Sequence, residues 1–403
     1  MNSAQAQRLV ESLRKGIPPD GFVRHFTVGR EGEINNLLSR LEQRKKGALL
    51  IKANYGSGKT HLLRFVRESA LERGFAVSFV TLDSKSAVRF NRMDQILGAI
   101  WRGLEIPGET GQKGVRPFFN YLHNQIQQAR TDSNGSNGFW SQLSNNWKWD
   151  YSDHLDSPSM YIALRAWGAD DGEAQDLIDD WFRQPWQYQA RRTLLYQSLV
   201  GGLRTHFRDP RPEQQFYSFD AGIFNFRFQN YSQSWACIRD IQTLAFESGL
   251  KGLILIFDEF EDVVSNLKNI KYQEDAFWNL FEFYSGKQYP GMSFYAVTPD
   301  FAQKCKDLLL DKDRWDFDYS RFEKLPTFQM SPLDVEELTD LAMKILETHG
   351  IAYSWEPDLE MKSSELKSIV KKAASVQVQD RARHTITAVV KSLDRLFEDH
   401  EDN

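Results

Sequence analysis

The sequence has little of what marks a secreted, zinc-binding or membrane-spanning protein. It contains two cysteines, Cys237 and Cys305, and neither lies in a CxxC motif or a Cys/His cluster, which argues against a disulfide framework and a zinc site. No apolar run reaches the roughly 18 residues that would cross a bilayer. Residues 1–21 lack the apolar core of a signal peptide. We therefore expect a cytoplasmic protein that does not enter a membrane.

An excess of charge of either sign is also missing. The net charge is −5, so the overall composition does not draw the chain to nucleic acid, although a local basic face stays open. The length of 403 residues fits two or three domains, and 41% hydrophobic residues allow a large core. The 11 tryptophans and 28 phenylalanines are explained first by that core.

A glycine loop carries the clearest motif that is present. The stretch ALLIKA predicts a short buried strand, and THLLRFVRESALERG predicts a helix. Between them, ANYGSGKT fits the phosphate-binding pattern G-x-x-x-x-G-K-[ST], except that Ala53 replaces the first glycine. Alanine is tolerated there if its backbone is extended, and it disrupts the loop only if φ must be positive. The strand, loop and helix together indicate a nucleoside triphosphate site.

The residue types of this loop suit a triphosphate. Gly56 and Gly58 allow a turn whose N–H groups face phosphate oxygens, and the next helix offers its positive end. Lys59 would reach the β- and γ-phosphates, and the Thr60 hydroxyl would help to coordinate Mg²⁺. The loop residues that we expect to bind the nucleotide are Asn54, Tyr55, Gly56, Ser57, Gly58, Lys59, Thr60 and His61.

A second motif follows much later, where the apolar stretch LILIF runs into carboxylates. Asp258 would hold Mg²⁺ through its waters, and Glu259 would orient or activate the attacking water. Taken alone, the stretch fits equally well a strand that ends in solvated acids, because Glu261 and Asp262 follow. Paired with the glycine loop, it indicates a working ATP-hydrolysis site.

Other polar residues are candidates for the transferred phosphoryl group. Thr298 ends the strand MSFYAV, where its hydroxyl would either touch the γ-phosphate or water, or cap the next helix. Arg314 and Arg321 would reach a neighbouring subunit's site, whereas Arg381 and Arg383 would act in cis. A surface salt bridge is the alternative for each arginine. The residues to which we assign catalysis are Lys59, Glu259, Thr298 and Arg321, with Arg383 binding nucleotide and with Thr60 and Asp258 binding Mg²⁺.

The predicted organisation is an ATPase core interrupted by a helical insertion. Residues 131–138, rich in glycine and asparagine, are expected to form a mobile loop within the insertion. The segments are an N-terminal helical arm (1–24), the first part of the core (25–100), an aromatic-rich helical insertion (101–245), the second part of the core (246–330) and a C-terminal helical lid with an acidic tail (331–403).

Together these motifs resemble an AAA+-type ATPase core. The segment TVGREGEI is similar to the part that precedes the P-loop in AAA+ and STAND ATPases, where Val28, Gly29 and Arg30 would lie near the adenine. More narrowly, three blocks resemble the ATP-binding proteins of the BREX anti-phage systems (the BrxD-like family). They are YGSGKTHLLRFVRESALERGFAVSFVTLD, ESGLKGLILIFDEFED and RARHTITAVVKSLD.

Two positions depart from that family's pattern. The family usually has glycine where Ala53 stands, and a proline commonly precedes the late arginine, where this chain has Ala382 before Arg383. The resemblance implies an α/β P-loop NTPase with a parallel sheet that uses ATP and Mg²⁺ and acts with other proteins of a bacterial defence system. A homo-oligomer and binding to double-stranded DNA stay open.

Three further questions are left open by the sequence. A STAND-like switch that holds ATP with slow or no turnover is the main alternative, and Glu259 is the residue that favours turnover. A nucleotide kinase or small-molecule transferase is compatible with the glycine loop but fits the GREGE segment and the late arginines poorly. The basic stretches RKKG, QARRTLLYQ and FNFRFQNY would either contact nucleic acid or form a solvated helix face.

Overall fold

The computed structural model describes most of the chain. Residues 132–138 of the predicted loop 131–138 and the basic stretch 189–197 lie outside the described residues, as does Asp262, whereas Thr131 is the last residue of a helix. The described residues are 1–83, 88–109, 111–131, 139–140, 154–168, 172–186, 226–261, 263, 267–356, 359–375 and 381–401.

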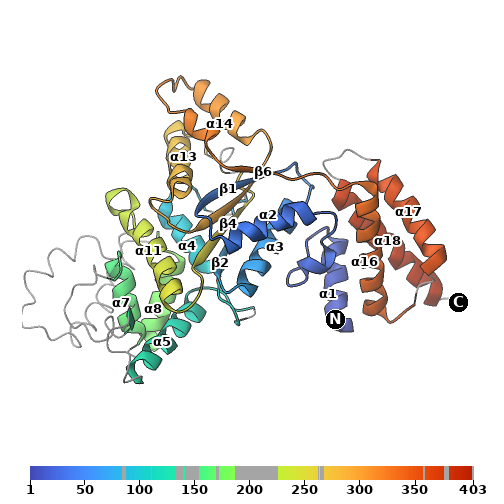
Figure 1. Cartoon of the computed structure of the whole chain (residues 1–403), viewed down its shortest axis with the longest axis horizontal. Helices are drawn as coiled ribbons and strands as arrows, with labels where there is room; N and C mark the ends of the chain where they lie inside the picture. Colours follow the sequence, from blue (N-terminus) through green and yellow to red (C-terminus); the bar gives the residue numbers. More distant parts are fainter. Residues whose placement is uncertain are drawn as a thin grey trace, which may run out of the picture.

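A single six-stranded sheet forms the centre of the described structure (Figure 1). Its order is β3-β2-β4-β5-β1-β6, and every neighbouring pair is parallel except β2 with β3. The expectation of an α/β fold with a mainly parallel sheet is therefore confirmed. The strands are β1 (Gly47–Lys52), β2 (Ala76–Thr81), β3 (Leu104–Glu105), β4 (Leu253–Asp258), β5 (Met292–Val297) and β6 (Thr327–Gln329).

The central strands are apolar on both faces because helices cover both sides of the sheet. All six residues of β4 and of β5 are buried, as expected for strands within a parallel sheet. One face packs against α2 (Glu31–Glu42) and α3 (Lys59–Glu72). The other packs against α4 (Met93–Gly103), α11 (Phe228–Glu247) and α13 (Ile270–Ser285).

The described part of the predicted insertion (101–245) is mostly helical, but it also contains β3, a strand of the sheet, and many of its aromatic side chains lie in the core. It contains α5 (Val115–Thr131), α7 (Pro158–Trp167) and α8 (Gly172–Arg183), at the lower left of Figure 1. Trp101 packs against Phe182 with ring centroids 5.1 Å apart, and Phe119 packs equally closely against Trp167. These rings join the cluster that covers one face of the sheet, so the insertion and the sheet share a hydrophobic core.

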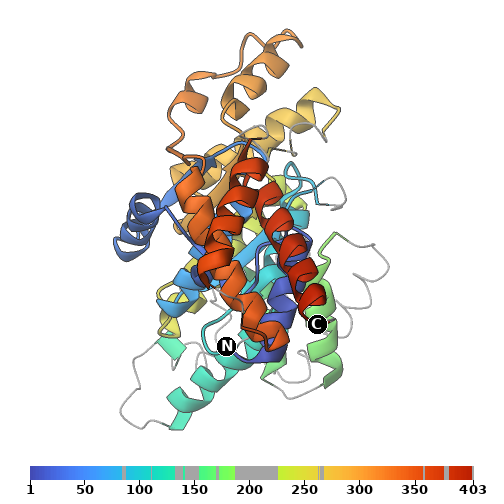
Figure 2. The same ribbon diagram turned by 90° about the vertical axis from the view of Figure 1, so that its right-hand side faces the viewer.

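Both ends of the chain meet in one helical body beside the sheet (Figure 2). Helix α1 (Ser3–Arg14) packs against α16 (Val335–Tyr353) and α18 (Arg381–Glu401), and α17 (Leu359–Ala374) completes the body. Leu9, Val10 and Leu13 are buried on one face of α1, which agrees with the predicted helical arm. They lie in the same core as the buried residues of α16 to α18. The arm thus packs as a fourth helix of the lid.

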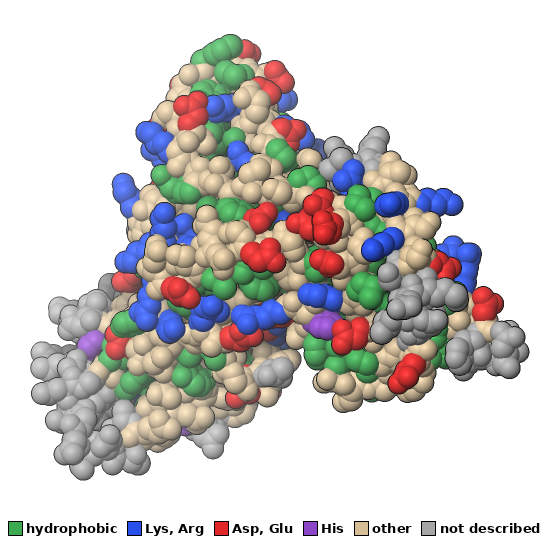
Figure 3. Space-filling view, turned by 45° about the vertical axis from the view of Figure 1, so that its right-hand side comes forward, with side chains coloured by type: hydrophobic (Ala, Val, Ile, Leu, Met, Phe, Trp, Pro, Cys, Tyr) green, Lys and Arg blue, Asp and Glu red, His purple; other side chains and the backbone are tan. Residues whose placement is uncertain are grey.

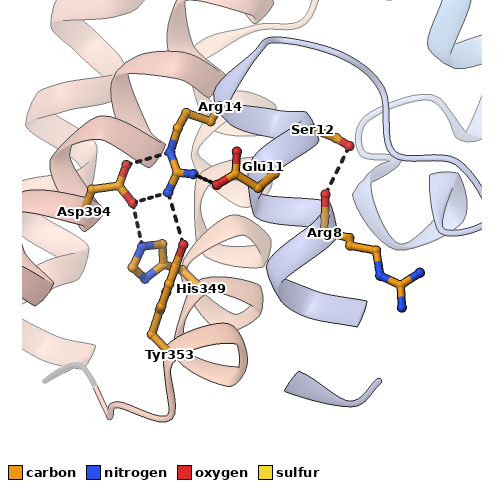
Figure 4. Close-up of polar contacts among 7 residues, drawn as sticks. All are labelled: Arg8, Glu11, Ser12, Arg14, His349, Tyr353 and Asp394. Carbon is orange, nitrogen blue, oxygen red and sulfur yellow. Dashed lines mark hydrogen bonds and ion pairs between the residues drawn. The ribbon is translucent and has the colours of Figure 1, made fainter. Parts of the chain in front are cut away.

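A polar network ties α1 to the lid (Figure 4). The Arg14 guanidinium donates to both oxygens of Asp394, at 3.0 and 2.8 Å, and to the Tyr353 hydroxyl at 3.1 Å. The Trp355 indole donates to His349 Nδ1 at 2.9 Å, which leaves Nε2–H to donate to Asp394 at 3.1 Å. Burial of His349 lowers the pKa of its imidazole.

The face of the molecule in Figure 3 carries charges of both signs. On the face in Figure 3, acidic side chains gather near the centre, and lysines and arginines lie beside them. In FNFRFQNY, Arg227 pairs with fully buried Asp94 at 2.8 Å, which gives this arginine a structural partner. None of the helices in the described ranges is long and apolar enough to cross a membrane.

Candidate functional site

The carboxyl ends of three parallel strands meet at one edge of the sheet. The glycine loop follows β1, Asp258 ends β4, and Thr298 comes directly after β5. Strand β5 lies between β1 and β4, so the loop and Asp258 come from strands that are not neighbours. Ligands of open α/β sheets bind outside such strand ends.

The loop after β1 has the backbone that its glycines predict. Gly56 and Gly58 have φ of 71° and 91°, in the left-handed region that favours glycine, and α3 begins directly afterwards at Lys59. Ala53 is not among the residues with positive φ, and its N–H donates to the Val297 carbonyl at 3.1 Å. The methyl group of Ala53 is therefore compatible with this loop.

Lys59 is held by groups inside the site. Its ammonium donates to the Ala53 carbonyl at 3.0 Å and to Glu261 Oε1 at 2.7 Å, and it lies 4.8 Å from the centre of the Tyr55 ring. The side chains of Lys59 and Glu261 are 8% and 6% exposed. The sequence assigned no role to Glu261, and a solvated acid at this place was only the alternative; the structure buries Glu261 against the loop lysine.

Thr60 and Asp258 lie together, as a shared magnesium site requires. The Thr60 hydroxyl hydrogen-bonds the Asp258 carboxylate, and the Glu259 N–H donates to Asp258 Oδ1 at 3.0 Å. Burial raises the pKa of Asp258, and the hydroxyl, the Glu259 amide and the charge of Lys59 oppose that rise. Hydroxyl and carboxylate oxygens are ligands that Mg²⁺ accepts, so the residues present fit this ion. Among the described residues, no group of three or more His, Cys, Asp and Glu side chains forms a metal cluster.

The segment before the P-loop supports the loop from the side of the lid. Arg30 is 4% exposed and donates to the Ser57 carbonyl at 2.9 Å and to the Ser331 carbonyl, between β6 and α16, at 3.1 Å. Burial lowers the pKa of this guanidinium. Gly29, with φ of 60°, lets α16 approach, because a Cβ there would lie 2.1 Å from Glu337 Oε1. Arg30 thus joins core and lid, a role that its sequence motif did not suggest.

His61 is neutral in this environment. Its Nε2 lies 2.9 Å from the Thr27 hydroxyl, which itself donates to the Val23 carbonyl at the start of η1 (Val23–Phe26). Burial lowers the pKa of His61 to about 4, and the charges of Arg30, Arg64 and Lys344 add to this shift.

One cavity joins these groups to an apolar wall. Its polar lining includes Lys59, Thr60, Asp258 and Glu259, with Arg30, His61 and residues 54–58. The wall comes from α1, from the loop after it, from η1 and from the lid. Its apolar residues include Leu13, Ile17, Phe26, Val28, Leu341 and Ile386. The sequence did not predict that residues from 13–19 line this cavity, because the segment has only the pattern of a helix end followed by prolines.

The candidate arginines divide between two places. Arg383 lines the cavity, and its side chain crosses Gly16, where an added Cβ would lie 3.0 Å from Arg383 Cγ. Arg321 lies elsewhere, on α15 (Ser320–Glu323), 4.3 Å over the Trp278 ring and 3.1 Å from Asp318. Arg314 pairs with Glu274. Arg381 is not part of the cavity lining.

Thr298 is placed at the sheet edge but does not line the cavity. It is 6% exposed, and its carbonyl accepts from the Phe301 N–H at the start of α14 (Phe301–Leu310). Lys304 and the Thr298 hydroxyl keep the pKa of Asp300 below its usual value. The N-cap of α14 is Asp300, and no side chain caps the helix, so the Thr298 hydroxyl bonds Asp300 and does not cap the helix as the alternative expected. Contact with the γ-phosphate stays a prediction.

The comparison with known families supports a nucleotide site. Residues 1–147 match the family model described as BREX system ATP-binding protein BrxC/D. The BREX family resemblance seen in the sequence is thereby confirmed. No curated protein and no solved structure matches the chain.

Proposed function

We propose that this chain, which resembles the BREX ATP-binding proteins over its first 147 residues, is a Mg²⁺-dependent ATPase with an AAA+-like P-loop core. The observation that carries the proposal is the convergence of Lys59, Thr60, Asp258 and Glu259 on one cavity from two strands that are not neighbours. A phosphate ligand, two magnesium ligands and a base are the parts that ATP hydrolysis needs.

Each of these residues would act on a different part of the reaction. Lys59 and the N–H groups of the glycine loop would bind the phosphates, and the start of α3 would add the positive end of its helix dipole. Thr60 and Asp258 would hold Mg²⁺, which neutralises charge that develops on the phosphates. Glu259 would orient and deprotonate water.

The apolar end of the cavity would take the base. Its wall comes from α1, η1, α16 and α18, so a nucleotide bound there would touch the core, the arm and the lid together. Arg383 at the same cavity would contact the phosphates in cis. Loss of the γ-phosphate would then alter the contact between core and lid, which is a way for hydrolysis to move the lid.

The partners of this ATPase are proposed from the family. Other proteins of the same defence system are expected to bind it, in the cytoplasm. Arg321 would complete the site of a neighbouring copy, and its position on α15, away from its own cavity, is compatible with action in trans. Double-stranded DNA is a candidate activator, which the experiment below includes.

A STAND-like switch is the second candidate function. The observation that favours it is the wall itself, because a nucleotide held between core and lid would fix their arrangement without turnover. In that case the helical insertion would dock a partner. Glu259, which lines the same cavity, favours ATP hydrolysis over a switch without turnover.

The test is steady-state ATP hydrolysis by the purified full-length chain, with and without double-stranded DNA. We expect turnover in the wild type and loss of ATP binding in Lys59→Ala, while the exposed-lysine control Lys45→Ala should behave as the wild type. Stimulation by DNA would support a DNA-linked ATPase. Tight ATP binding with no turnover, unchanged by Glu259→Gln, would reject hydrolysis and favour the switch.

A further inference from the structure

A third carboxylate lies inside the proposed phosphate site. Glu261 lines the cavity, and its Oε1 accepts from Lys59 Nζ at 2.7 Å. This is the same lysine that would bind the β- and γ-phosphates. Glu261 has no part in the magnesium pair, since Asp258 accepts from Thr60 and from the Glu259 amide.

The fold itself places Glu261 there. After β4 the chain turns at Glu259, whose φ of 55° is unusual for a residue with a long side chain. Phe260 is 1% exposed within the aromatic core, and its N–H donates to the Ala296 carbonyl at 3.2 Å. Because the Phe260 side chain is held in the aromatic core, the next residue, Glu261, faces Lys59. Its position therefore follows from buried backbone contacts rather than from a mobile surface rotamer.

Glu261 is also incompletely satisfied. Its Oε2 is buried, and no hydrogen-bond partner for that atom exists among the residues that the structure describes. A buried carboxylate with one unbonded oxygen is costly for stability, and a functional role is one explanation for such a group. An amide or an apolar side chain would remove this charge but would leave the buried Lys59 ammonium without its carboxylate, so pairing with Lys59 accounts for one oxygen and the unbonded oxygen needs another explanation.

The chemistry of Lys59 supplies one. A phosphate oxygen that binds this ammonium must share it with Glu261 or replace it, and the negative charge of Glu261 also repels a polyanion in the same low-dielectric cavity. We propose that Glu261 is a positioning residue that holds Lys59 at the strand ends and competes with nucleotide phosphates for it, thereby lowering nucleotide affinity. This inference rests on the proposed ATP site.

The test is isothermal titration of the full-length chain with ATP and with ADP, each with and without Mg²⁺. In Glu261→Gln, which keeps the shape and removes the charge, Kd for both nucleotides should fall by about tenfold or more, because the competing ion pair is gone. Glu261→Asp keeps the charge and should return Kd toward the wild-type value. The exposed-carboxylate control Glu247→Gln should leave Kd unchanged.

Steady-state kinetics gives a second readout that a merely structural role would not move. Under the inference, Glu261→Gln lowers KM for ATP and changes kcat by less than about threefold, as expected when a ground-state binding competitor is removed. A fall in kcat at unchanged KM would overturn it, as would an unchanged or weaker Kd in a folded Glu261→Gln protein. If the wild type and Glu261→Gln both fail to bind ATP, the proposed function fails; if the wild type binds and the variant does not tighten, only this inference fails.

Discussion

Two of the ion pairs that join residues far apart in the sequence differ in how fully their carboxylates are hydrogen-bonded. Lys59–Glu261 is almost fully buried at 2.7 Å, and Glu261 Oε2 has no partner among the described residues. Arg14–Asp394 is a quarter to a third exposed, and both Asp394 oxygens accept from Arg14. The lid pair is the arrangement expected of a structural clamp, whereas the core pair keeps bonding capacity for a ligand.

The substitution with the largest expected effect on this contrast is Glu259→Gln. If the sheet edge at which β1, β4 and β5 end is the catalytic region, loss of the base should reduce kcat by about 100-fold or more. The free energy of unfolding should hardly change, because the substitution keeps size and shape. ATPase assays and urea unfolding on the same preparation measure both quantities. Comparable losses of activity and stability would mean that Glu259 belongs to the framework.

Acidification should destabilise both regions. Burial lowers the pKa of His61 to about 4 and also lowers that of His349, so both are neutral in the folded chain. Below pH of about 6.5 these imidazoles bind protons in the unfolded chain, whereas they stay neutral in the folded chain until the pH approaches their lower folded pKa. Stability is therefore complete above that pH and is lost as pH falls toward the folded pKa. For His61 alone the loss between about pH 7.5 and pH 5 is roughly 2 kcal/mol.

Urea unfolding at these two pH values checks this sign. His61→Gln keeps a hydrogen-bonding group near Thr27 and should flatten the pH dependence. The exposed His384→Gln is the matched control and should leave the dependence as in the wild type. If the loss of unfolding free energy between the two pH values is the same or larger in His61→Gln, His61 does not resist protonation.

The lid clamp should contribute stability without chemistry. Asp394→Ala leaves the Arg14 guanidinium and the buried Nε2–H of His349 without their acceptor, which should cost about 1 to 2 kcal/mol of unfolding free energy. Glu11→Gln is the control, because Glu11 meets the same arginine at the surface, where a pair contributes less than about 1 kcal/mol. Chemical unfolding measures both variants. A kcat that falls more than KM changes in Asp394→Ala would contradict the division of labour.

The same contrast explains what could be predicted from the sequence. The β1 loop and the end of β4 were readable, because the glycines, Lys59 and Asp258 each meet a local requirement of a phosphate site. The strand order that brings them together was not, since it depends on β5 lying between β1 and β4. The burial of Glu261 was not predicted, because it follows from a turn at Glu259 that no local sequence pattern indicates. The packing of α1 on α16 and α18 escaped for a similar reason: the two segments are more than 300 residues apart, as in the Arg14–Asp394 pair.

The smallest expected effect belongs to the one residue at which the glycine loop departs from its pattern. Ala53 has a backbone that any residue adopts, and its side chain is 1% exposed within the core beneath the sheet. Ala53→Gly should therefore leave kcat and KM within about threefold and lower the unfolding free energy by about 0.5 to 1 kcal/mol, since glycine gains freedom in the unfolded chain. Gly58→Ala, at φ of 91°, is the matched opposite and should damage nucleotide binding through backbone strain. A tenfold gain of activity in Ala53→Gly would mean that the methyl group restrains the loop, and would place Ala53 beside Glu261 among the residues that hold affinity down.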